Sequence, residues 1–313
     1  MFQVKNTLLS KNRYDEYMRD NYIQFNYTNN FNKPLTCKQL TSGAILSVCD
    51  DIGWSCSIKS VQMLLSHYFI KWGKTDDIMN DIYRENGCLS IHRFLKKCKK
   101  QNCSEKVGDY FGVYTALQIY KLLLNENNIF QKPYIVSYDF IHITTDNIID
   151  IDEINRDEKT ILIFSTRLGM NKLENYYKEM IIRLFLCPQF DGILGGVGKS
   201  CYYFMGRHTH LDNLTYLDPH FITDYDEHKL LGEIRGFNYL STHIDNLNPS
   251  LTFCFSYDNN DEFMELKKFL ELNTVFNILH KKSMKPTENS SIVSQSTINL
   301  NTSTELNSDW EFC

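Results

Sequence analysis

Apolar residues recur every three or four positions directly after the segment Gly53 to Cys56. They are Ile58, Val61, Leu65, Tyr68 and Trp72. This spacing is typical of an amphipathic helix that buries one face. It predicts a helix that begins at about Cys56.

Other segments alternate between helical and extended patterns. Helices are predicted over 90–100, 114–126, 174–186 and 261–273. Short apolar or alternating runs predict strands over 160–165, 201–208, 213–222 and 251–257. Because helices come first and strands dominate later, the order favours an α+β fold over a regular βαβ repeat.

The composition changes near the end of the chain. Nearly half of the residues in 282–313 are Ser, Thr or Asn. Such a segment buries too little apolar surface to offset its ordering entropy. We therefore expect one folded domain over 1–281 and a disordered tail over 282–313.

Bulk composition excludes some classes of function. The 313 residues are 42% hydrophobic, which suffices for a substantial core, and the formal net charge is -5. A net acidic chain argues against nucleic acid as the main partner, although a local basic patch stays possible.

The N-terminal apolar run is short and soon broken by charge, and no window of apolar residues is long enough to span a membrane. We expect a cytoplasmic protein.

The ten cysteines are too sparse for a disulfide scaffold in a chain of this length. Cys98 and Cys103 lie close together, but no CxxC pair or zinc-finger spacing accompanies them. We expect free thiols, no metal and no cofactor.

Cys56 stands where a thiol could become a nucleophile. The partial positive charge at a helix start lowers the pKa of a thiol, and the preceding Gly53 permits a tight turn. The backbone N–H of Cys56 is left unpaired by the helix and could stabilise an oxyanion. A cysteine before a helix is also commonly just a small buried residue.

The segment Leu217–His220 offers a base. If it continues a strand, Asp218 and His220 point to one face, with Pro219 between them pointing away. His220 could then take a thiol proton, and Asp218 could orient the imidazole. A surface turn is the alternative interpretation.

Several motifs occur together in a fixed order: DDIGWSCSIKSVQMLL, SIHRFL, GDYFGVYTA, RLGMNKLENYYK, GILGGVGKSCYYFMG, LDPH and LNPSLTFCF. From about Tyr22 to Leu270 the chain resembles the autophagin family, the autophagy-related cysteine proteases. The resemblance implies a papain-like fold with a small added helical subdomain. It implies a monomer that cleaves a ubiquitin-like autophagy modifier after glycine and releases it from phosphatidylethanolamine. Contact with autophagic membranes would come through that lipidated substrate.

The resemblance also assigns roles to residues. It places Cys56 as nucleophile, Asp218 and His220 as the orienting and basic groups, and Tyr27 as part of the oxyanion site. Tyr110 corresponds to a tryptophan that covers the nucleophile. Gly195, Gly196 and Gly198 fall in a flexible regulatory loop, so these residues are expected to form a lid over a narrow groove. Trp310, in DWEFC, resembles the anchor of a short motif that docks on the modifier.

The neighbourhood of the nucleophile departs from the family pattern. Ser55, Ser57, Lys59 and Val61 stand where the family has Gly, Met, Arg and Gly. No reacting atom is lost, so we expect activity to survive. Lys59 cannot make a bidentate contact, which puts a fixed carboxylate partner in doubt.

Two alternatives remain from the sequence. One is a papain-like protease acting on another ubiquitin-like protein, and the other is a catalytically silent protein that only binds the modifier.

A redox switch at the nucleophile would need a second thiol beside Cys56, and Cys49 is the nearest cysteine in the sequence.

Overall fold

The computed structural model describes residues 1–39, 44–130, 136–142, 148–150, 159–235, 239–273 and 275–279. Within these residues the chain alternates helices and strands, and the predicted α+β class is confirmed. The predicted domain boundary after residue 281, the tail over 282–313 and Trp310 all lie outside the described residues.

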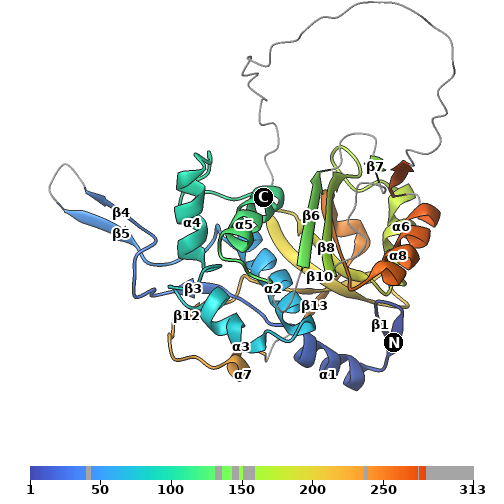
Figure 1. Cartoon of the computed structure of the whole chain (residues 1–313), viewed down its shortest axis with the longest axis horizontal. Coiled ribbons are helices and arrows are strands. Elements are labelled where there is room, and N and C mark those ends of the chain that lie inside the picture. Colours follow the sequence, from blue (N-terminus) through green and yellow to red (C-terminus); the bar gives the residue numbers. More distant parts are fainter. Residues whose placement is uncertain are drawn as a thin grey trace, which may run out of the picture.

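A large, mostly antiparallel sheet runs through the middle of the molecule (Figure 1). Its main strands, in spatial order, are β13 (Leu240–His243), β11 (Asn213–Leu217), β10 (Ser200–His208), β9 (Phe190–Val197), β14 (Leu247–Tyr257), β8 (Lys159–Arg167) and β6 (Val136–His142). β6 is parallel to β8. At the N-terminus, β1 (Phe2–Val4) pairs with both β10 and β2 (Thr7–Leu9).

Helices cover both faces of this sheet (Figure 1). One apolar cluster joins the sheet to α1 (Lys11–Asn21), α2 (Cys56–Lys71), α4 (Ile91–Lys100) and α5 (Val113–Glu126). A second cluster joins the opposite face to α6 (Asn175–Leu184) and α8 (Asn260–Leu272). Neighbouring residues of β9 divide between the two, since Ile193 packs in the second cluster and Leu194 in the first. This alternation follows from the two-residue period of a strand.

The remaining elements are short. They are β3 (Tyr27–Asn29), β4 (Thr36–Gln39), β5 (Ile45–Val48), α3 (Thr75–Asp77), the π-helix Ile78–Tyr83, β7 (Ile148–Asp150), β12 (Ile222–Asp224), α7 (Leu231–Ile234), the 3₁₀ turn Ile244–Asn246 and β15 (Asn277–Leu279). Of these, β3 and β12 matter most for the site because they pair in parallel and join the N-terminal region to the C-terminal half.

The helix α2 begins at Cys56, as predicted, but the expectation of one buried face is wrong. Every residue from Cys56 to Phe69 is buried. The sheet lies on one side of α2 and other helices pack on the rest, so the polar residues need partners inside the protein. Gln62 Nε2 donates to the carbonyl of Leu89 at 3.2 Å, and Ser66 Oγ donates to that of Met63 at 2.7 Å. These bonds offset the cost of burying polar groups.

The structure confirms the other predicted helices as α4, α5, α6 and α8, and the predicted strands as β8, β10, β11 and β14. The N-terminal helix α1 was not predicted. Its buried residues are only Tyr14 and Met18, and the polar residues around them hide the helical period.

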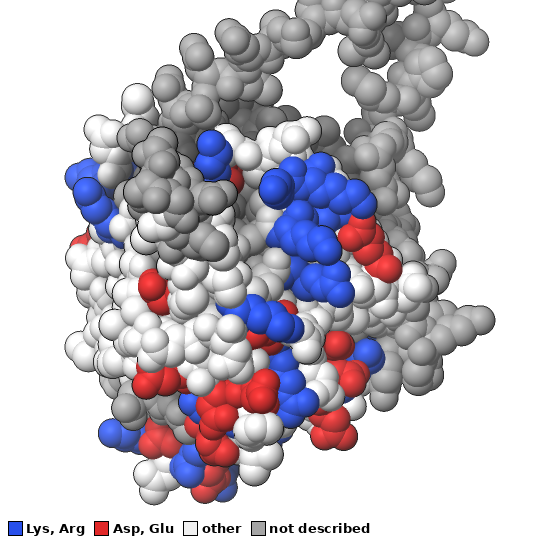
Figure 2. All heavy atoms as spheres, turned by 90° about the vertical axis from the view of Figure 1, so that its left-hand side faces the viewer, with Lys and Arg blue, Asp and Glu red and all other residues white. Residues whose placement is uncertain are grey.

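Charge is unevenly distributed over the surface. The helix α4 carries no acidic residue and exposes Arg93, Lys96, Lys99 and Lys100. Figure 2 looks onto the side of the molecule where α4 lies and shows Lys and Arg side chains gathered in one area. The chain thus has a local basic patch despite its net negative charge. Within the described residues, no helix has the length and apolar character needed to cross a membrane.

Candidate active site

Cys56 is the first residue of α2 and is only 3% exposed. The chain enters the helix through a turn in which Gly53 has a φ of 84°. An L-residue with a side chain is strained at such an angle, so glycine suits this turn. The turn places the Cys56 thiol at the N-terminal end of α2, where unpaired N–H groups favour negative charge.

Asp218 and His220 lie in a turn, not on a strand. The strand β11 ends at Leu217, and β12 begins only at Ile222. The expected strand alternation is therefore wrong, and a local hydrogen-bonded turn brings the two side chains together instead. The backbone N–H of His220 donates to Asp218 Oδ1 at 2.9 Å, and the His220 ring Nδ1 lies 2.5 Å from the same oxygen.

The imidazole of His220 reaches Cys56 as well as Asp218. Because Nδ1 is taken by Asp218, the nitrogen left for the sulfur is Nε2. Burial by itself lowers the pKa of His220, but hydrogen bonds with Asp218 and Cys56 and the charges of both groups raise it to about 9. The raised pKa means that the imidazole of His220 favours its protonated form at neutral pH.

Tyr27 brings a hydroxyl to the same sulfur. Its side chain is buried with Cys56 and forms a hydrogen bond with it, and its ring meets the His220 ring edge-on at a centroid distance of 5.2 Å. Burial, followed by the neighbouring Cys56, raises the pKa of Tyr27 far above its usual value. The hydroxyl thus keeps its proton at neutral pH and remains a hydrogen-bond donor.

Hydrogen bonds to backbone carbonyls hold Tyr27 and the Asp218–His220 turn in place relative to each other. The N–H of Tyr27 donates to the carbonyl of Pro219 at 2.8 Å, which ties β3 to the turn that carries His220. Gln24 Nε2 donates to the carbonyl of Asp218 at 2.9 Å. Two residues shortly before and within β3 thus fix the turn that carries the base.

The segment between α4 and α5 contains Tyr110, which is 48% exposed and lies close enough to Tyr27 to influence the pKa of its hydroxyl. Ser57, next to the nucleophile, donates from Oγ to the carbonyl of Phe111 at 2.6 Å. The serine at this position therefore fastens the Tyr110 segment to the start of α2.

Gly195 and Gly196 do not lie in a loop. Both belong to β9, where Gly195 is opposite Tyr202 and Gly196 opposite Cys201 on β10. Only Gly198 lies in the turn between these strands. A Cβ on Gly195 would come within 2.6 Å of Leu251, so this glycine permits close packing against β14. The expectation of a flexible loop over all three glycines is wrong.

Lys59 has a fixed carboxylate partner, contrary to expectation. Its Nζ lies 2.7 Å from Asp51 Oδ2, and both side chains are buried. Sequence reasoning did not single out Asp51. The signal was present, because a lysine among the apolar positions of a helix needs an acidic partner when it is buried. Asp51 was the acidic residue next to the turn at Gly53.

Cys201 was also missed. It comes from β10 and packs in one small buried cluster with Cys56 and Tyr27. Burial, and then the proximity of Cys56, raises the pKa of Cys201 above its ordinary value. The cysteine that packs against Cys56 is thus this one, and the sequence neighbour Cys49 is absent from the cluster.

The described cysteines are all free thiols, and the described residues hold no cluster of three or more His, Cys, Asp or Glu side chains arranged to bind a metal. The site consists of protein groups: a buried thiol, an imidazole in contact with it, a carboxylate that orients the imidazole, and a phenol that can donate to an anion. These are the parts needed for acyl transfer through a thioester.

Comparison with known proteins gives a consistent result. A sequence model of the peptidase C54 catalytic domain matches residues 12–269, which include all four of these side chains. The cysteine protease ATG4 of Candida albicans is 27% identical over 256 residues, covering 79% of this chain and 57% of that protein.

Two further relatives have similar names. The probable cysteine protease ATG4 of Meyerozyma guilliermondii is 27% identical over 219 residues, covering 70% of this chain and 52% of the relative. The cysteine protease ATG4 of Kluyveromyces marxianus is 28% identical over 225 residues, covering 66% and 49%. The match thus spans about half of the length of these curated relatives.

Proposed function

This chain belongs to the peptidase C54 family, and from that premise we propose that it is a thiol peptidase in which Cys56 is the nucleophile. One observation carries the proposal: the buried Cys56 thiol is hydrogen-bonded to His220, whose other ring nitrogen is held by Asp218. A protein kept only for binding would not need this arrangement.

The reaction proceeds in two acyl transfers. Once the Cys56 proton has passed to His220, the thiolate forms a bond to the substrate carbonyl carbon. The carbonyl oxygen becomes an anion, which the Tyr27 hydroxyl and the Cys56 backbone N–H stabilise by donating hydrogen bonds. The imidazolium then gives its proton to the leaving amine as the C–N bond breaks. Water activated by His220 hydrolyses the resulting thioester and restores the thiol.

The substrate we propose is a ubiquitin-like autophagy modifier, cleaved after a glycine near its C-terminus and also released from phosphatidylethanolamine. The relatives named ATG4 support this choice. Tyr110, half-exposed in the segment that Ser57 holds to the start of α2, would narrow the approach so that only a slim glycine backbone passes. Membrane contact would come through the lipidated substrate, and we propose a cytoplasmic monomer with a papain-like core.

A panel of substrates tests this function. The full chain is incubated with the modifier carrying extra C-terminal residues, with the lipidated modifier on vesicles, and with C-terminally extended ubiquitin, and product masses are measured. We expect both forms of the modifier to be cut to a product that ends in glycine, and ubiquitin to stay intact. Cleavage of ubiquitin alone would point to a different ubiquitin-like substrate. If no substrate is cut but the modifier still binds, the peptidase function is refuted.

A further inference from the structure

Lys59 lies one helical turn after the nucleophile, deep inside the protein. Its side chain is only 6% exposed, yet it carries a charge in a helix that is buried on every side. Its Nζ is 2.7 Å from Asp51 Oδ2 and donates to Thr28 Oγ1 at 3.0 Å. Burying such a pair costs desolvation energy, and replacing it with apolar residues is often neutral for stability. Stability alone therefore does not explain it.

Asp51 uses its second oxygen to hold the strand that carries Tyr27. The N–H of Thr28 donates to Asp51 Oδ1 at 2.6 Å, and the N–H of Asp51 donates to the carbonyl of Thr28 at 3.1 Å. Thr28 is thus gripped through both of its backbone groups, and its hydroxyl receives the bond from Lys59. Tyr27 is the residue directly before it.

The other side of Tyr27 is held by a different part of the chain. Its N–H donates to the carbonyl of Pro219, and Tyr27 is paired with Ile222 across the parallel β3–β12 ribbon. The position of Tyr27 is therefore set between two anchors. One is the turn that carries His220, and the other is Asp51 with Lys59 on the helix of Cys56.

We propose that Lys59 and Asp51 are positioning residues that fix the Tyr27 hydroxyl relative to the Cys56 sulfur. This inference rests on the proposed peptidase function and deepens it. Lys59 connects the nucleophile's own helix, through Asp51 and Thr28, to the strand of the oxyanion donor. A shift of that strand would move the hydroxyl away from the developing oxyanion, while Cys56, His220 and Asp218 kept their own contacts.

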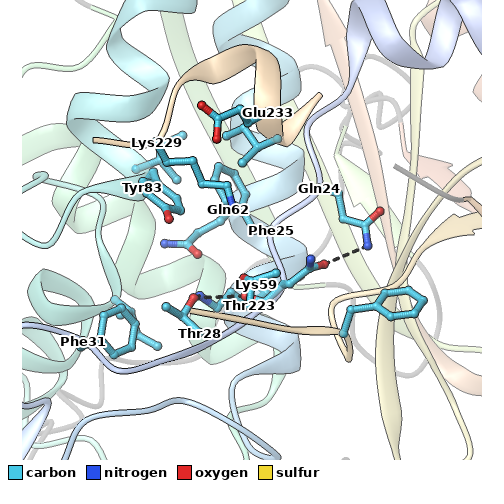
Figure 3. A pocket seen from close by; sticks show the side chains of 15 residues that line it. Gln24, Phe25, Thr28, Phe31, Lys59, Gln62, Tyr83, Thr223, Lys229 and Glu233 are labelled. Atoms are coloured by element: carbon cyan, nitrogen blue, oxygen red, sulfur yellow. Dashed lines mark hydrogen bonds between the residues drawn. The ribbon is translucent and has the colours of Figure 1, made fainter. Parts of the chain in front are cut away.

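Lys59 lies beside a cavity, so the ion pair with Asp51 and not tight packing sets the position of its side chain. A space of about 250 Å³ is lined by Lys59, Thr28 and Phe31 among others. Figure 3 shows the hydrogen bond between Lys59 and Thr28 at this cavity, with Tyr83, Lys229 and Glu233 also around it. Because the lysine is not packed tightly on this side, its polar contacts decide where it lies. The same space leaves room for the larger guanidinium of Lys59→Arg.

A peptide aldehyde ending in glycinal tests the proposal at the oxyanion. The Cys56 sulfur adds to the aldehyde carbon, and the thiol proton ends on the former carbonyl oxygen, which occupies the oxyanion position. Affinity for this aldehyde and kcat for the modifier are measured for Lys59→Met, Lys59→Arg, Tyr27→Phe and the double variant Lys59→Met/Tyr27→Phe. Thermal melting of each variant reports whether it is folded.

We expect Tyr27→Phe to weaken aldehyde affinity and kcat by about 100-fold, the usual effect of losing one oxyanion donor. Lys59→Met should weaken both by about tenfold with little change in KM, because misplacement costs less than removal. Lys59→Arg should stay near wild type. In the double variant, loss of the lysine should add almost nothing to loss of the phenol, because both act through one donor.

Thr28→Val provides a second route if Lys59→Met does not fold. It removes the hydroxyl that receives the lysine bond and leaves the ion pair in place. Its smaller loss of aldehyde affinity should likewise disappear in the Tyr27→Phe background.

Two results would overturn this inference, and a third would refute the proposed function instead. If Lys59→Met lowers the melting temperature but leaves aldehyde affinity unchanged, the pair is only structural. Losses that multiply in the double variant also overturn the inference, because the residues then act independently. A wild type that binds the aldehyde but cleaves no modifier would instead refute the proposed function and leave the positioning role to be decided by the aldehyde data.

Discussion

A single carboxylate oxygen of Asp218 holds both the backbone and the ring of His220. The His220 N–H donates to Asp218 Oδ1 at 2.9 Å, and the ring Nδ1 lies 2.5 Å from the same atom. Two bonds to one oxygen restrict rotation of the imidazole and fix its tautomer. The remaining ring nitrogen is thereby kept for Cys56.

The pH dependence of catalysis should report the pKa of His220, which Asp218 helps to raise. The pKa of His220 is lowered by burial but raised more by Asp218 and Cys56, to about 9. A raised pKa means that the imidazolium persists to higher pH, so its benefit is present at neutral pH and is lost as the pH rises through about 9. We expect the alkaline limb of kcat/KM near that value.

Asp218→Asn is the matched change for this prediction. It keeps the shape of the side chain but removes the negative charge, so the alkaline limb should move to lower pH. The value of kcat should fall on the order of 10⁴-fold because the tautomer is no longer fixed. A pH–rate profile with an unmoved alkaline limb would contradict the role given to Asp218.

Ser57→Ala should loosen the segment that carries Tyr110. The variant loses the hydrogen bond to the carbonyl of Phe111 and leaves that buried group unpaired, at a cost of about 1–3 kcal/mol. We expect faster amide hydrogen exchange around Tyr110 and a higher KM for the modifier. Ser66→Ala is the control, because Ser66 bonds only within α2. Equal effects of both variants would mean that the Phe111 contact has no special role.

Gly195→Ala should destabilise the sheet. The added Cβ would meet Leu251 Cδ2 at 2.6 Å between β9 and β14, and overpacking of this kind costs about 1–3 kcal/mol. Chemical denaturation should show the loss. Gly232→Ala is the control, since nothing lies within 4 Å of its added Cβ. Unchanged stability in Gly195→Ala would instead favour the loop interpretation of this segment.

Periodicity predicted the long elements well and the local environment poorly. The apolar spacing after Cys56 located α2 correctly, but it predicted one buried face. Its polar residues are buried too, and they bond to loops that a single segment does not reveal. The turn at Asp218 was likewise read as a strand, since a two-residue spacing fits both structures.

The sequence could predict the residues of the site whose type limits the chemistry they perform. It could not predict which other residues pack beside them. Residue type made Cys56, Asp218 and His220 candidates, and the ordered motifs of the autophagin resemblance assigned them their roles. Cys201 and Asp51 could not be placed beside the nucleophile, because their proximity depends on how β10 and the turn before α2 pack. The sequence put a fixed carboxylate partner for Lys59 in doubt, because a lysine cannot make a bidentate contact. A single short ion pair with Asp51 nevertheless forms in the protein interior.

Cleavage of the extended modifier by the full chain, compared with Cys56→Ala and Cys187→Ala, tests most directly whether Cys56 is the nucleophile. Cys187 is also buried, but it packs in the apolar cluster on the opposite face of the sheet. We predict that wild type and Cys187→Ala release a product ending in glycine, and that Cys56→Ala binds the modifier without cutting it. Continued cleavage by Cys56→Ala, or an intact modifier after incubation with folded wild type, would contradict the assignment.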